Sequence, residues 1–157
     1  MANSICDSKL SFSECELEIL RNAVDVAEKR LAIDKVRSPN VKEIINIVEL
    51  FLKNKKLICY GGTAINNILP KKDQFYNYGE EIPDYDFFSP NALEDAKELA
   101  DIYYNEGFTE VTASAGVHHG TYKVFVDFIP VADITQISQV IFKSFKKNAV
   151  QVDNILY

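Results

Sequence analysis

Two aspartates in the run IPDYDFF have the spacing of a metal site. Asp84 and Asp86 flank Tyr85 in a run that is otherwise apolar, as expected for a short strand. On a strand, residues i and i+2 share a face and lie about 6.6–6.8 Å apart. Two carboxylates held that close repel each other unless a cation lies between them, and they can bracket divalent ions about 3.5–4 Å apart. The pair therefore predicts a divalent-cation site, although a DxD spacing alone is common by chance.

A third aspartate interrupts a second apolar run, KVFVDFIPV. The alternation predicts one continuous strand over 122–129, in which Val124, Val126 and Phe128 form one face and Asp127 lies on the other. An ionised aspartate there would cost several kcal/mol if it were dry and unpaired, so it needs an open cleft or a cation. Three hard oxygen ligands, without a histidine or a thiolate nearby, favour Mg²⁺ or Mn²⁺ over zinc. Asp127 is therefore the predicted third ligand.

A double glycine supplies the second half of the predicted site. Gly61, Gly62 and Thr63 follow the apolar run LICY, which predicts a strand that turns directly into a helix. Because glycine has no Cβ, backbone N–H groups at such a turn can approach a phosphate closely, near the positive end of a helix. A nucleoside triphosphate whose oxygens bridge two Mg²⁺ ions would use both halves of the site. In-line attack on its α-phosphorus is the reaction that such an arrangement supports, mostly by positioning and charge neutralisation.

Each of these motifs also has a simpler structural interpretation. The double glycine alone is about as often a plain turn, and the aspartate pair alone is more often a polar strand end. Asp127 fits equally an edge strand that faces water. His118-His119, before Gly120, fits a hairpin turn best, because adjacent side chains on an extended chain point to opposite sides. The order of the three motifs along the chain, each at a strand end, favours one shared site.

Hydrophobic periodicity predicts the elements that must position these residues. Helical spacing from Leu17 to Leu31 and again over 41–52 predicts two N-terminal helices with a break at Ser38-Pro39. The predicted order after them is a strand over 57–60, a helix over 63–69, an exposed loop over 70–81, a strand over 84–88, a helix after Ser89-Pro90, and a hairpin with its turn at 116–120. Residues 131–157 fit a helix and a strand equally well.

The expected fold class is α/β (α+β), with a small mixed sheet and helices packed on one face, preceded by N-terminal helices. We expect residues 1–38 to form a helical segment and residues 39–157 to form the domain that carries the site. A chain of 157 residues, 47% of them apolar and 25% charged, fits one globular core.

The bulk properties also narrow the class of protein. A net charge of −6 argues against tight nonspecific binding to nucleic acid. No apolar stretch approaches ~18 residues and the N-terminus lacks the layout of a signal peptide, so we expect a cytoplasmic protein without a membrane span. Three cysteines without a paired spacing predict free thiols.

The chain resembles a known family in the order of its motifs and in the residues around them. Gly61-Gly62-Thr63, then Asp84-Tyr85-Asp86, then Asp127 resembles the nucleotidyltransferase superfamily that includes DNA polymerase β and poly(A) polymerases. The longer stretches YGGTAINNILPKKDQFY, EIPDYDFFSPNALEDAKELA and FVDFIPVADIT are similar to poly(A) polymerase catalytic subunits of giant nucleocytoplasmic DNA viruses. The similarity runs from about residue 30 to the end, and it implies the nucleotidyltransferase fold.

The resemblance implies a specific reaction and a role for each motif. The reaction is template-independent transfer of AMP from ATP to RNA 3′ ends, as in mRNA polyadenylation, by two-metal-ion catalysis. Asp84 and Asp86 would hold both Mg²⁺ or Mn²⁺ ions, and Asp127 would hold the catalytic one and help to activate the 3′-hydroxyl. Gly61, Gly62 and Thr63 would contact the triphosphate. The implied setting is the viral factory or the virion of a large DNA virus.

The chain departs from the family in two respects. Loop 70–81 lengthens the interval between the glycines and the aspartates. The family enzymes are several times longer, with a further domain that helps to hold the base and the RNA. We therefore expect a catalytic domain that is incomplete at its C-terminus, and the expected partners are a further C-terminal domain or a second copy in a homodimer. A nucleotidyltransferase that modifies a protein or a small molecule, and an incomplete fragment that binds Mg-NTP or a partner, stay open as alternatives.

Overall fold

The computed structural model describes residues 11–157. Two helices lead the chain, α1 (Phe12–Arg37) and α2 (Pro39–Lys55), and they meet at Ser38. The extended backbone of Ser38 ends α1, and its Oγ accepts a hydrogen bond from the Val41 N–H at 3.3 Å, which caps α2. The predicted break at Ser38-Pro39 is confirmed.

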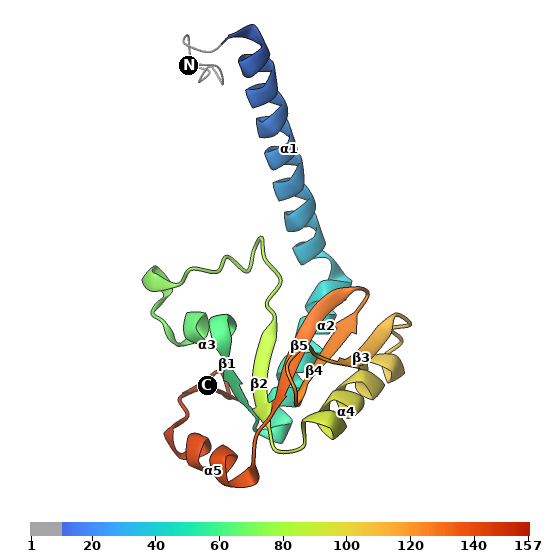
Figure 1. Ribbon diagram of the computed structural model, residues 1–157, viewed down its shortest axis with the longest axis vertical. Helices are drawn as coiled ribbons and strands as arrows, with labels where there is room; N and C mark the ends of the chain where they lie inside the picture. The colour runs from blue at the N-terminus through green and yellow to red at the C-terminus, as the bar shows by residue number, and fades with distance from the viewer. Residues whose placement is uncertain (1–10) are drawn as a thin grey trace.

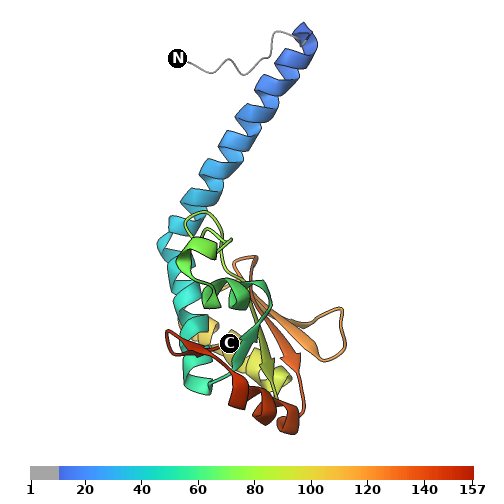
Figure 2. The same cartoon turned by 90° about the vertical axis from the view of Figure 1, so that its left-hand side faces the viewer.

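Helix α1 projects away from the remainder of the molecule (Figures 1 and 2). The apolar side chains that predicted this helix do not join the core, since Leu17, Leu20, Val24 and Leu31 are each more than half exposed. An ion pair between Lys29 and Glu80, 3.3 Å long, connects α1 to loop 70–81. The buried core residues lie between Val41 and Ile155. The domain boundary at residue 38 stays a prediction.

A mixed sheet of seven strands, within residues 11–157, forms the body of the molecule in the order β3-β4-β5-β2-β1-β7-β6. Pairs β2·β5 and β1·β7 are parallel and the other pairs are antiparallel. The strands are β1 (Ile58–Tyr60), β2 (Tyr85–Ser89), β3 (Val111–Ala115), β4 (Thr121–Val126), β5 (Ile129–Gln136), β6 (Gln151–Val152) and β7 (Ile155–Leu156). The helices after α2 are α3 (Gly61–Ile68), the 3-10 turn η1 (Lys71–Asp73), α4 (Ala92–Asn105) and α5 (Gln139–Asn148).

One face of the sheet carries the core, under α2 and α4. Tyr85, Phe87 and Ser89 of β2 are buried on this face. The ring of Phe51 in α2 packs against Phe87 with centroids 6.4 Å apart, and the Ser89 hydroxyl donates to Asp95 of α4. This packing fixes the alternation of β2, so that the residues between these three point to the opposite face.

The opposite face carries Asp86 and Phe88. Phe88 stacks on Tyr60 with ring centroids 4.1 Å apart and contacts Phe145 of α5 at 5.6 Å. Helix α5 therefore covers the Phe88 end of this face, whereas Asp86 borders a cavity. The predicted α/β class with a mixed sheet is confirmed, and α5 adds a helix on the second face.

Most predicted elements are confirmed, including the exposed loop 70–81 and the β3–β4 hairpin. The continuous strand over 122–129 is wrong: β4 ends at Val126, because Asp127 and Phe128 form a two-residue turn with φ of 50° and 62°. The undecided C-terminal region contains strand β5, helix α5 and the short β6–β7 hairpin.

Two of the three cysteines predicted to be free thiols lie within the described residues. Cys59 is a free, buried thiol, as predicted. Cys15 is disulfide-bonded, so the prediction of a free thiol is wrong there, and Cys6 lies outside the described residues. Among residues 11–157, no helix has the length and apolar character that a membrane span requires.

Candidate functional site

Four residues form a row across the open face of the sheet. Lys123 of β4 pairs with Asp133 of β5, Asp133 pairs with Asp86 of β2, and Asp86 pairs with Tyr60 of β1. Because neighbouring strands lie about 4.8 Å apart, the carboxylates of Asp86 and Asp133 are close neighbours. Asp84 precedes β2 by one residue and lies on the Asp86 side. The structure thus brings Asp84, Asp86 and Asp133 together.

The double glycine adjoins this carboxylate cluster. Helix α3 begins at Gly61, directly after β1, and within the described residues no side chain caps its first turn. Gly61 has a φ of +75°, and a Cβ at this position would lie 2.3 Å from Asp86 Oδ2. Glycine is required here both by the backbone conformation and by the close approach of the carboxylate. The first-turn amides of α3 are therefore available to an anion beside Asp86.

Thr63 connects the two halves of the site. Its hydroxyl donates to the backbone carbonyl of Asp84 at 2.7 Å, and its side chain is buried. This hydrogen bond fixes the first turn of α3 to the start of β2. With the hydroxyl engaged in this way, a contact from Thr63 to a triphosphate would come from its backbone N–H; that contact stays a prediction.

The cluster is electrostatically unfavourable even with the Lys123 ammonium beside it. Burial, followed by the charges of Asp133 and Asp86, raises the pKa of Asp84 to about 6, although Lys123 acts against this shift. Burial and Asp133 raise the pKa of Asp86 as well. Asp84 Oδ1 is a buried atom without a hydrogen-bond partner among the described residues. Hard carboxylate oxygens with one buried and unpartnered atom fit Mg²⁺ or Mn²⁺.

Asp133 pairs with Lys123 in this structure. The Lys123 ammonium donates to Asp133 Oδ2, and this hydrogen bond is the main reason that the pKa of Lys123 is raised. In the part of the chain that is described, no three His, Cys, Asp or Glu side chains are arranged to hold a metal ion. A metal ion bound at Asp133 Oδ2 would compete with Lys123 for that oxygen.

The structure does not bring Asp127 to this cluster. The Asp127 N–H donates to the carbonyl of Glu110 at 2.8 Å, and the residue borders a different cavity with Phe108 and Gly107. Along β4 it lies four residues beyond Lys123, which is about 13 Å on an extended strand. The turn at Asp127 therefore separates this residue from the aspartate pair, and the carboxylate that lies beside the pair is that of Asp133.

Sequence reasoning missed Asp133 because the segment that contains it was undecided between helix and strand. The signal was present in the alternation of IPVADITQ, where Ala132 and Ile134 are buried and Asp133 between them is partly exposed. The parallel pairing of β2 with β5 is the decisive feature, and no local pattern reports it.

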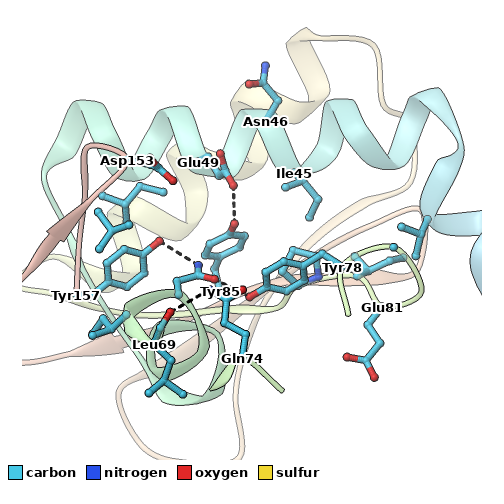
Figure 3. Close-up of a pocket in the computed structure, with 18 of the residues that line it drawn as sticks. Ile45, Asn46, Glu49, Leu69, Gln74, Tyr78, Glu81, Tyr85, Asp153 and Tyr157 are labelled. Atoms are coloured by element: carbon cyan, nitrogen blue, oxygen red, sulfur yellow. Dashed lines mark hydrogen bonds between the residues drawn. The ribbon is translucent and has the colours of Figure 1, made fainter. Parts of the chain in front are cut away.

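Two cavities lie on either side of the loop after α3. A cavity of about 290 Å³ is bordered by Gly62, Tyr76 and the aspartate pair. A larger one, of about 980 Å³, lies on the α2 side (Figure 3), where Tyr85 reaches Glu49 with a 2.7 Å hydrogen bond. Tyr85 therefore holds the DYD segment from the face opposite the carboxylates.

We expect the metal-free chain to lose stability as the pH rises from about 4 to about 6, through Asp84. The pKa of Asp84 is about 6 when folded, against an ordinary value of 3.8. Between these values the folded protein binds a proton that the unfolded chain has released, so rising pH removes stability until about pH 6 and has no further effect through this group above it. The measurement is thermal unfolding in EDTA from pH 4 to 7.

The control for this pH effect is Asp84→Asn, which cannot titrate. The wild type should lose stability relative to Asp84→Asn across the same interval. Parallel pH profiles for the two proteins would contradict the assignment.

The comparisons with known proteins agree on one family. The family model described as "Poly(A) polymerase catalytic subunit" matches residues 46–157. A protein of African swine fever virus (strain Badajoz 1971 Vero-adapted) that carries this description is 42% identical over 130 residues, which are 80% of this chain and 27% of the relative. The corresponding protein of Acanthamoeba polyphaga mimivirus is 30% identical over 139 residues, which are 84% of this chain and 23% of the relative. This chain thus spans about a quarter of the length of the curated relatives.

A solved structure supports the same conclusion at the level of the fold. The crystal structure of the Megavirus polyadenylate synthase superposes with a TM-score of 0.76 and 25% identity, covering 100% of this chain and 32% of that protein. The nucleotidyltransferase fold expected from the motifs is therefore confirmed.

Proposed function

Because the chain belongs to the family of poly(A) polymerase catalytic subunits, we propose that it transfers AMP from ATP to RNA 3′ ends without a template. One observation carries this proposal: the Asp86 carboxylate fills the space that Gly61 leaves by lacking a Cβ. Backbone amides that can bind phosphate therefore lie next to carboxylates that can bind metal ions, as transfer from a nucleoside triphosphate requires. In this proposal residues 39–157 form the catalytic domain, and the reaction belongs to the factory or the virion of a large DNA virus.

Each residue of the cluster has a distinct role in this proposal. Asp84, Asp86 and Asp133 would hold two Mg²⁺ or Mn²⁺ ions, with Asp133 in the third position that sequence reasoning gave to Asp127. Bound there, the ions supply charge neutralisation at the α-phosphate and lower the pKa of the attacking 3′-hydroxyl. The amides of Gly61 and Gly62 would bind the triphosphate. The hydrogen bond from Thr63 to Asp84 keeps these two parts in register.

The proposal is tested by extension of an RNA oligonucleotide with labelled ATP and Mg²⁺. We expect the RNA to grow by many nucleotides and growth to stop in EDTA. Label on the protein or on a small molecule would support a different nucleotidyltransferase. Binding of Mg-ATP without any extension would support the incomplete fragment that binds but does not turn over.

A further inference from the structure

The loop between α3 and β2 returns over the first turn of α3. A Cβ at Gly62 would lie 2.5 Å from the hydroxyl of Tyr76 and 3.2 Å from its ring. The Tyr76 hydroxyl therefore occupies the space in which a side chain at position 62 would stand. Tyr76 also borders the cavity that Asp84 and Asp86 border, so the loop contributes a group to the candidate site.

A buried amide holds this loop in place. Asn66 of α3 is fully buried, and its Oδ1 accepts the backbone N–H groups of both Phe75 (2.8 Å) and Tyr76 (2.9 Å). The Tyr76 ring also packs against Phe75, with centroids 4.7 Å apart. Two hydrogen bonds to one buried acceptor fix the backbone from which the tyrosine projects.

Two tyrosines of the loop differ in what their hydroxyl groups do. The Tyr78 hydroxyl donates to Asn67 Oδ1 at 2.9 Å and accepts from Asn66 Nδ2 at 3.3 Å, so its capacity is used. The Tyr76 hydroxyl makes no hydrogen bond within residues 11–157, and the side chain is 39% exposed. A phenolic donor that is held in position and points beside a predicted phosphate-binding turn is available to a ligand.

We propose that the Tyr76 hydroxyl donates a hydrogen bond to the β- or γ-phosphate of the nucleotide bound at Gly61 and Gly62, an inference that rests on the proposed function. The α-phosphorus has to lie at the carboxylates, which places the remaining phosphates toward the first turn of α3. A hydrogen bond to an anionic oxygen is stronger than one between neutral groups, so one hydroxyl contributes measurably. The long interval between the glycines and the aspartates thereby acquires a role: it supplies a donor that the glycine turn lacks.

The test compares Tyr76→Phe with two other tyrosine variants. Binding of Mg-ATP, Mg-tripolyphosphate and Mg-AMP is measured by displacement of a fluorescent ATP analogue. Tyr76→Phe should weaken ATP and tripolyphosphate about 10-fold, the size of one hydrogen bond to a charged group, and leave AMP unchanged. Tyr104→Phe, an exposed position on α4, should match the wild type. Tyr78→Phe should lower thermal stability while keeping the ratio of ATP to AMP affinity.

The outcomes separate this inference from the proposed function. If the wild type binds Mg-ATP and Tyr76→Phe binds it with equal affinity, the role of Tyr76 is overturned and the proposed function is not. Equal losses for ATP and AMP would also overturn it, because a structural effect of the loop does not depend on the β- and γ-phosphates. A folded wild type that binds neither ATP nor tripolyphosphate would overturn the proposed function and this inference together.

Discussion

Replacing Asp133 by asparagine is expected to lower AMP transfer by about 10³-fold, whereas Asp127→Asn should leave the rate unchanged. Loss of one metal ligand removes several kcal/mol of transition-state stabilisation, and each 1.36 kcal/mol is tenfold in rate. Asp133 pairs with Asp86 across adjacent strands, whereas Asp127 lies in a turn with its N–H bonded to Glu110. Asparagine tolerates the φ of 50° at position 127 as well as aspartate does, so this variant is a matched control.

The measurement is the initial rate of RNA extension, together with a Mn²⁺ titration of each variant. Asp133→Asn should weaken Mn²⁺ binding, and thermal unfolding should show that the sheet is intact. Because asparagine also loses the ion pair with Lys123, a modest change in stability is expected without loss of the fold. The opposite result, a strong loss for Asp127→Asn and none for Asp133→Asn, would restore the prediction made from sequence.

The second large effect is expected for Asp86→Asn. This carboxylate lies against Gly61, pairs with Asp133 and borders the cavity, so it is the residue shared by the metal and phosphate halves of the site. We expect a loss of about 10³-fold in transfer or more. The folded protein should not lose stability in EDTA, because burial and Asp133 raise the pKa of Asp86 and removal of its charge relieves both effects.

The matched control for this second variant is Asp101→Asn, which changes an exposed aspartate on α4. Extension assays and thermal unfolding in EDTA are compared for the two proteins. Transfer that survives in Asp86→Asn at the level of Asp101→Asn would contradict the metal assignment altogether.

The sequence was sufficient for the local half of this site. The double glycine and the DYD segment are each defined by neighbouring residues, and the structure places them in contact as the motifs predicted. The position of Asp133 beside this pair could not be predicted from neighbouring residues in the sequence. Two-residue hairpin turns usually carry Asn-Gly, and here Asp127 and Phe128 form one without that signature. The turn ends the strand early, and the chain returns as β5 with a different aspartate beside β2.

Periodicity likewise predicted that α1 is a helix, but it did not predict whether another element packs against its apolar side chains. Residues from Leu17 to Leu31 repeat at helical spacing, which the structure confirms, yet their side chains are largely exposed. A repeat of apolar residues reports the face that a helix could bury and says nothing about whether a partner element is present. The same limit applies to loop 70–81, because no sequence pattern predicted that Asn66 would hold Tyr76 over Gly62.

Lys123 gives the cluster a counter-ion of its own. Under the proposed function, an ion that binds Asp133 Oδ2 would compete with this ammonium, which is tethered to the neighbouring strand. An ion delivered together with a triphosphate would keep further oxygen ligands, so Asp133 would exchange the Lys123 ammonium for it more readily than for a free ion. If the proposed function holds, we expect metal and nucleotide to enter the site as one complex. Under the same proposal, Lys123 would pair with Asp133 whenever the site holds no ion, so this carboxylate would keep a counter-ion between one addition and the next.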